Sequence, residues 1–239
     1  AKGKSFYYYG RVMESLDKVE DAMTFYLKAK DVLENSQEYK LLGLMSEGLG
    51  NLNRKQKLFD AALINFRTSL QFYSKMPDSL GISFAYRNIG RVFLYNEQLD
   101  SAYYYFDKAL HIADIKKYPS VSSMLLEVGV VHRSAGDYLG AESYFLSFIE
   151  QERNENNLYS GYLALGNLYL YMNRLEDAKM YLTLCLKSSN LVIKRDACEC
   201  LYDLEKELDN FKGAIGYKDI ADSLRIITQD IDIQNSIAT

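Results

Sequence analysis

The stretch that decides the fold runs from Tyr86 to Ala109 and reads YRNIGRVFLYNEQLDSAYYYFDKA. Gly90 is followed twelve residues later by Ala102, and the polar residues 96–98 lie between them. Apolar side chains three and four positions apart on either side of this polar segment are typical of two amphipathic helices. The stretch therefore predicts a helical hairpin with a short turn.

The same spacing recurs along the whole chain. The pairs are Gly10/Ala22, Gly50/Ala62, Gly90/Ala102, Gly129/Ala141, Gly166/Ala178 and, in a degenerate sixth copy, Tyr202/Ala214. Glycine is a poor helix former, so its recurrence inside helices needs a packing reason. Two helices whose axes lie about 8–10 Å apart need small side chains where they cross. We therefore interpret each pair as the crossing point of one hairpin.

These copies resemble the tetratricopeptide repeat (TPR), and Gly90, Ala102, Phe106 and Ala109 carry the match best. The resemblance implies an all-α fold, a right-handed α-solenoid of about six TPR-like helical hairpins. Successive copies are 40, 40, 39, 37 and 36 residues apart, whereas the common repeat has about 34 residues. The extra residues follow the second helix, near Pro77 and Pro119. Such lengthened repeats are similar to those of scaffold members of the family and of peptide-sensing bacterial regulators.

The pattern also sets the expected boundaries. We expect one superhelical domain over residues 1–228, because each hairpin buries its apolar face only against its neighbours, and a C-terminal helical extension or linker over residues 229–239. The repeats are expected near 3–35, 38–75, 79–117, 120–153, 157–189 and 192–228. First helices are expected near 3–16, 38–54, 79–95, 120–134, 157–172 and 192–208, and second helices near 18–34, 57–75, 98–117, 138–153, 175–189 and 211–228. Charged residues crowd the first helix of the sixth repeat and indicate a polar cap: Glu199, Asp203, Glu205, Lys206 and Glu207.

Composition excludes several classes of function. The net charge is -4, so the basic excess that binding to nucleic acid requires is absent. No run of 18 apolar residues predicts a membrane span, and neither the three cysteines nor the two histidines have the spacing of a metal site. No phosphate-binding loop or nucleophile motif is present. We therefore expect no enzyme activity, no cofactor and no metal.

The sequence does not determine the cellular compartment, although it slightly favours the cytoplasm. The chain starts at Ala1 without a methionine, so a larger or processed protein is expected.

Two tyrosine runs, residues 7–9 and 103–105, each span about 200° of a helix, so their rings are expected to divide between core and surface.

The resemblance places a binding groove on the first helices, which line the concave side of such a superhelix. The predicted ligand-binding residues are Arg11, Asn51, Arg54, Arg87, Arg91, Tyr95, Arg133, Asn167 and Tyr171. Repeats one to three are cationic with an asparagine, while repeats four and five are mainly apolar and aromatic. Arginine and asparagine can hold a carboxylate or a peptide backbone through charge-assisted or bidentate hydrogen bonds.

Asn51, Arg87 and Arg91 are similar to part of the carboxylate clamp of some TPR co-chaperones. The first repeat departs from that clamp, because Tyr7 and Arg11 stand where it has a lysine and an asparagine. The alternative interpretation is that these side chains are solvated charges on helix faces.

A second candidate surface lies at the C-terminus. Ile220, Leu224, Ile227 and Ile231 are spaced four, three and four residues apart, which is the seam of a helix that pairs with another helix. For Ile220 and Leu224 the alternative is packing against the sixth repeat. Leu224, Ile227 and Ile231 are the predicted oligomerisation residues, and a homodimer is a possible consequence.

The sequence therefore favours a protein-protein interaction module that binds a peptide or protein segment in its groove. It would be the sensing or docking part of a larger bacterial regulatory protein. The alternative is a structural or oligomerisation module that self-associates through the C-terminal helix. A small-molecule or enzyme role would need an enclosed pocket with converging polar groups, which an open solenoid seldom provides.

Overall fold

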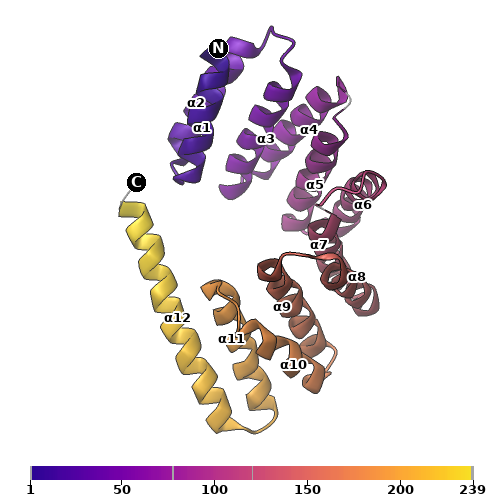
Figure 1. Cartoon of the computed structure of the whole chain (residues 1–239), viewed down its shortest axis with the longest axis vertical. Coiled ribbons are helices and arrows are strands. Elements are labelled where there is room, and N and C mark those ends of the chain that lie inside the picture. Colours follow the sequence, from indigo (N-terminus) through magenta and orange to yellow (C-terminus); the bar gives the residue numbers. More distant parts are fainter. Residues whose placement is uncertain (1, 77, 120, 238–239) are drawn as a thin grey trace. The chain divides into compact units, whose positions relative to one another are not determined.

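The computed structural model describes residues 2–76, 78–119 and 121–237, with the side chains of residues 230–237 outside the description. The described chain is all-helical (Figure 1). Its helices are α1 (Lys2–Ser15), α2 (Val19–Leu33), α3 (Tyr39–Lys55), α4 (Phe59–Ser74), α5 (Ser79–Tyr95), α6 (Leu99–Ile115), α7 (Val121–Ser134), α8 (Tyr138–Gln151), α9 (Glu155–Tyr171), α10 (Leu175–Cys185), α11 (Leu191–Glu207) and α12 (Phe211–Ile237). The predicted all-α repeat of six TPR-like hairpins is confirmed.

The chain forms two compact units, Ala1–Met124 and Leu125–Ala238, which divide inside α7. Predicted helix boundaries agree with the structure to within two residues, except at two ends. Helix α10 ends at Cys185, earlier than expected, and α12 continues through residues 229–237 without a break. The expectation of one domain over residues 1–228 stays a prediction.

Every hairpin turn has the same backbone geometry. Three residues separate the two helices, and the middle one has a positive φ: Asp17, Lys57, Glu97, Gly136, Asn173 and Asp209. In the first turn, Lys18 N–H donates to the Met13 carbonyl and Asp17 N–H donates to the Glu14 carbonyl. This is the Schellman pattern, which satisfies the last carbonyls of the first helix. The same pair of bonds recurs in the other five turns, so six first helices end in one way.

The repeated glycines mark close contacts between the two helices of each hairpin. A Cβ atom on Gly50 would lie 2.6 Å from Cε1 of Phe66, whose ring is fully buried. Carbon atoms in good contact are about 3.5–4.0 Å apart, so only glycine leaves room for the ring. The same relation joins Gly10 to Tyr26, Gly90 to Phe106, Gly129 to Phe145 and Gly166 to Leu182.

Neighbouring hairpins share their cores within each unit. In the first unit, Ala22 and Tyr26 of α2 pack in one cluster with Leu49 and Leu52 of α3. In the second, a continuous cluster extends from Phe145 of α8 to the first helix of the last hairpin. Within these clusters a first helix packs against its own second helix and against the second helix of the preceding hairpin, as expected for stacked repeats.

The predicted polar cap needs a correction at Glu205. Its side chain is buried, with 2% of the residue exposed, and it pairs with Lys179 of α10 at 2.7 Å. Asn210 also donates to this carboxylate. A carboxylate can be buried when it is paired and hydrogen-bonded. Glu205 therefore links the last two hairpins and does not face solvent.

The tyrosine runs divide between core and surface as predicted. Tyr7 is buried, whereas Tyr8 and Tyr9 are each 56% exposed. In the second run, Tyr103 and Tyr104 are exposed, and Tyr105 stacks on Phe93 with ring centroids 5.4 Å apart.

Candidate functional site

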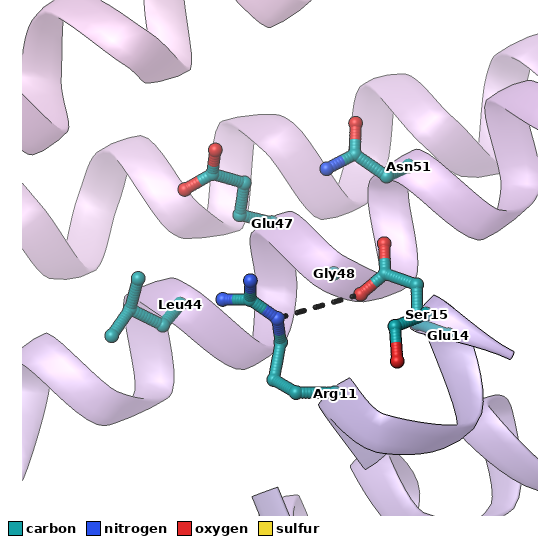
Figure 2. A pocket seen from close by; sticks show the side chains of 7 residues that line it. All are labelled: Arg11, Glu14, Ser15, Leu44, Glu47, Gly48 and Asn51. Carbon is teal, nitrogen blue, oxygen red and sulfur yellow. Dashed lines mark ion pairs between the residues drawn. The ribbon is translucent and has the colours of Figure 1, made fainter. Parts of the chain in front are cut away.

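A pocket of about 280 Å³ opens between α1 and α3 of the first unit (Figure 2). Its lining residues are Arg11, Glu14 and Ser15 of α1 and Leu44, Glu47, Gly48 and Asn51 of α3. The α3 residues are spaced three and four apart and so share one helix face. A Cβ atom on Gly48 would lie 2.7 Å from the Tyr26 ring. Glycine at this position therefore lets the ring pack directly beneath the pocket.

Arg11 is held by groups on its own hairpin. Its Nη1 donates to the Tyr7 hydroxyl at 3.1 Å, and its Nε lies 3.8 Å from Oε2 of Glu14. The bond to Tyr7 is the main reason that the pKa of Arg11 is raised. The Tyr26 hydroxyl donates to the same Glu14 oxygen at 2.5 Å, and burial, with this bond, raises the pKa of Tyr26. The positive charge of Arg11 is thus partly balanced inside the pocket.

Glu47 connects the pocket to the next hairpin. Its Oε2 accepts from the Tyr73 hydroxyl and its Oε1 accepts from Asn88 Nδ2, both at 3.1 Å. Burial raises the pKa of the Glu47 carboxyl, although the two bonds oppose this shift. A carboxylate with a raised pKa in a pocket is a typical feature of functional sites.

The pocket therefore differs in charge from the cationic zone that the sequence predicts for repeats one to three. It contains one guanidinium, two carboxylates and one amide. Glu14 and Glu47, absent from the predicted set, contribute both negative charges. A ligand here meets hydrogen-bond acceptors as well as donors.

Arg54 near the end of α3 and Tyr95 at the end of α5 come together. The guanidinium of Arg54 lies 5.6 Å from the centroid of the Tyr95 ring, within range of a cation-π interaction. Tyr95 is 60% exposed. The Nε atom of Arg54 is buried and has no hydrogen-bond partner among the described residues. Buried donors are nearly always satisfied, so the Nε atom of Arg54 is an exception among the described residues.

The remaining predicted residues have different surroundings. Arg87 and Arg91 lie one turn apart on α5 and are both half-buried. In the second unit, Arg133 near the end of α7 is half-buried, and Asn167 accepts a hydrogen bond from the Cys200 thiol. Tyr171 is exposed and stacks on Tyr138, with ring planes 19° apart.

The nine predicted residues thus fall into two sets. Arg11, Asn51, Arg54, Arg87, Arg91 and Tyr95 belong to the first unit, and Arg133, Asn167 and Tyr171 to the second. Within the first set, the structure brings Arg11 together with Asn51 and Arg54 together with Tyr95.

The predicted oligomerisation residues also separate. Leu224 is buried, with 9% exposed, whereas Ile220 and Ile227 are each 46% exposed. The side chain of Ile231 lies outside the described residues. Among the predicted stripe, Ile220 and Ile227 therefore remain on the surface.

The described residues contain neither a candidate membrane span nor a candidate metal cluster. None of their helices combines the length and the apolar character that crossing a membrane requires. No group of three histidine, cysteine or acidic side chains in this part of the chain could hold a metal ion.

No family model matches the chain. It is 25% identical over 126 residues to "Uncharacterized protein ycf37" of Guillardia theta, covering 53% of this chain and 67% of that protein. Solved structures of similar fold include PilW and RapI. PilW, described as a widely conserved type IV pilus biogenesis factor, has a TM-score of 0.74 with 18% identity, over 91% of this chain and 90% of that one. The apo form of RapI has a TM-score of 0.73 with 15% identity, over 96% and 85%. These likenesses show a TPR-like fold.

Proposed function

We propose that this chain is a protein-protein interaction module that binds a peptide or protein segment across the first helices of its first unit. The observation that carries the proposal is the mixed-charge pocket between α1 and α3. A peptide backbone offers N–H donors and carbonyl acceptors along its length. Glu14 and Glu47 can accept hydrogen bonds from the N–H groups of the peptide. Asn51 and Arg54 can donate hydrogen bonds to its carbonyl oxygens.

The surroundings of the pocket support this assignment. Glu47 is held in place by residues of α4 and α5, so it is oriented before any ligand arrives. Preorganised groups lose less entropy on binding. Tyr95, exposed beside Arg54, offers an aromatic surface of the kind that is enriched at interfaces. We further propose that the chain is the sensing or docking part of a larger bacterial regulatory protein.

A peptide selection on the intact chain tests the assignment. A displayed library is panned against the wild-type protein, and the selected peptides are measured by fluorescence anisotropy against two variants. Asn51→Arg fills the pocket with a long side chain, while Gln71→Arg adds the same side chain at an exposed position of α4 in the same unit. We expect Asn51→Arg to weaken binding at least about tenfold, as a central contact does, and Gln71→Arg to leave it unchanged. Equal binding to both variants would show that the selected peptides do not bind in the pocket.

A second candidate function is self-association through α12. Ile220 and Ile227 are seven residues apart, lie on one helix face and are half exposed. Sedimentation of the double variant Ile220→Lys, Ile227→Lys tests it, with Ile215→Lys as the control because Ile215 is also exposed but lies on another face. A dimer lost only in the double variant would support this function, and a wild-type monomer at all concentrations would reject it.

A further inference from the structure

Glu47 is a half-buried carboxylate whose hydrogen-bond partners are both neutral. One oxygen accepts from the Tyr73 hydroxyl and the other from the Asn88 amide. No lysine, arginine or histidine of the described residues forms an ion pair with it. Charged groups that leave water are normally paired with an opposite charge. Burial raises the pKa of the Glu47 carboxyl, which indicates that the two neutral partners compensate its negative charge only in part.

The lining of the pocket as a whole also has a negative charge in excess. Glu14 and Glu47 contribute two carboxylates and Arg11 contributes one guanidinium. The guanidinium is held by groups of its own helix, because its Nη1 donates to the Tyr7 hydroxyl and its Nε lies 3.8 Å from Oε2 of Glu14. The other oxygen of Glu14, Oε1, accepts no hydrogen bond from the described residues. Complementary charge favours a ligand group that is positive.

The positions of these groups suit one long basic side chain. Figure 2 shows Glu47 and Asn51 on successive turns of α3, with Glu14 pointing toward them from α1. The side chain of Asn51 forms no hydrogen bond within the described part of the chain, so its carbonyl oxygen is a further acceptor. Leu44 lines the same pocket and offers apolar surface. Lysine and arginine combine an apolar stem with a charged end that has several N–H donors, and so match both parts of the pocket.

We propose that this pocket receives a lysine or arginine side chain of the bound peptide. The inference rests on the proposed function, since it names the ligand group that enters the same pocket. The charged end would donate to Glu47, Glu14 and Asn51, while the stem would lie against Leu44. A peptide carboxylate would instead place a third negative charge beside Glu14 and Glu47, and like charges this close repel. The pocket therefore selects a basic residue over an acidic terminus.

The test compares charged and neutral forms of the same peptide on the intact chain. Peptides selected from a displayed library are kept when Asn51→Arg weakens their binding, because these peptides occupy the pocket. Each is synthesised again with norleucine in place of one lysine, or citrulline in place of one arginine. These replacements keep the length of the side chain but carry no charge. Fluorescence anisotropy then gives the affinity of each charged peptide and of its neutral form.

Three variants of the chain separate the pocket from general electrostatic attraction. Glu47→Gln and Glu14→Gln each remove one carboxylate of the lining and keep an oxygen acceptor for Tyr73 and Tyr26, respectively. Asp107→Asn is the control, because it removes the same charge from an exposed position of α6 in the same unit. Circular dichroism checks that each variant keeps the helix content of the wild type. If Glu47→Gln does not fold, Glu14→Gln decides the comparison.

At one basic position we expect the charged peptide to bind the wild type at least about tenfold more tightly than its neutral form. This ratio should decrease at least about threefold on Glu47→Gln and on Glu14→Gln, because the charge of the peptide then has one carboxylate fewer to bind. On Asp107→Asn the ratio should stay unchanged. A decrease confined to the two pocket variants would locate the basic side chain beside these carboxylates.

Two outcomes would overturn the proposal while the proposed function stands. The first is that peptides weakened by Asn51→Arg contain no lysine or arginine whose neutralisation weakens binding. The second is that the ratio of charged to neutral affinity is the same on the wild type and on Glu47→Gln. A separate outcome, in which Asn51→Arg weakens none of the selected peptides, would reject the proposed function and this inference together.

Discussion

Replacing Gly50 by alanine tests the close helix contact that defines each hairpin. The new Cβ would lie 2.6 Å from Cε1 and 2.7 Å from Cδ1 of Phe66, whose ring is fully buried. Overpacking of this kind costs about 1–3 kcal/mol. Alanine gains about 1 kcal/mol over glycine in a helix. The expected net result is a loss of about 0–2 kcal/mol in the free energy of unfolding.

A control and a double-mutant cycle isolate the overpacking from the helix propensity. A Cβ atom added to Gly216 in α12 would meet no neighbouring side chain or helix within 4 Å, so Gly216→Ala should gain about 1 kcal/mol. In a Phe66→Ala background the ring is gone, and Gly50→Ala should then also stabilise by about 1 kcal/mol. Urea unfolding followed by circular dichroism measures all five proteins. If Gly50→Ala has the same effect with and without the Phe66 ring, the contact does not explain the glycine.

Three further predictions concern titrating groups. Lys179→Met should reduce stability by about 1–3 kcal/mol at pH 7, because it leaves the buried Glu205 carboxylate without its cation. Lys179 holds the pKa of Glu205 below its usual range, so the stability lost in Lys179→Met should become smaller as the pH falls through that pKa. An equal loss of stability at pH 7 and pH 3 in urea unfolding would contradict this. Burial raises the pKa of Cys185 and of Cys200 to about 12, so both thiols should react with Ellman's reagent at pH 8 about a thousandfold more slowly than a free thiol until urea is added. Rapid labelling of either thiol in the native chain would show that it is not buried as described. Peptide affinity in the pocket should fall as the pH falls through the raised pKa of Glu47, because the protonated carboxyl is a poorer acceptor, and Glu47→Gln should remove that dependence in anisotropy titrations.

The repeat was predictable because its contacts are local in sequence. The glycine and the alanine of one hairpin are always twelve residues apart, and the ring that fills the glycine lies four residues beyond the alanine in repeats one to four. A pattern with fixed short spacing can be recognised in a single chain. The end of α10 was not predictable, because residues 186–189 contain neither the proline nor the glycine that would indicate a helix end.

Phe148 shows where a pattern of single positions is insufficient. Seven residues after the repeat alanine, the other repeats have a small residue: Ala29, Ser69, Ala109, Cys185 and Ala221. In the sequence, Phe148 is the exception at this position. In the structure its ring is buried against Gly161 of the next helix, where a Cβ atom would lie 2.5 Å from Cδ1. The large side chain is compensated by a glycine thirteen residues later. Such exchanges between two sites cannot be read from one sequence.

The pocket was predicted in part. Arg11 and Asn51 line it as first-helix residues should, but its charge depends on Glu14 and Glu47. The pairing of Glu14 with Arg11 had a sequence signal, because the two are three residues apart on a helix. The contacts of Glu47 with Tyr73 and Asn88 span 26 and 41 residues, and nothing in the local sequence indicates them.

The uniform hairpin turn determines where this chain can change length. Each turn inside a hairpin has three residues, and its middle residue adopts the left-handed conformation. The segments between hairpins have three to five residues. An inserted residue inside a hairpin would rotate the second helix away from its glycine, whereas one between hairpins would only lengthen a surface loop. Tags, epitopes or protease sites should therefore be tolerated around residues 34–38, and rejected at residues 56–58.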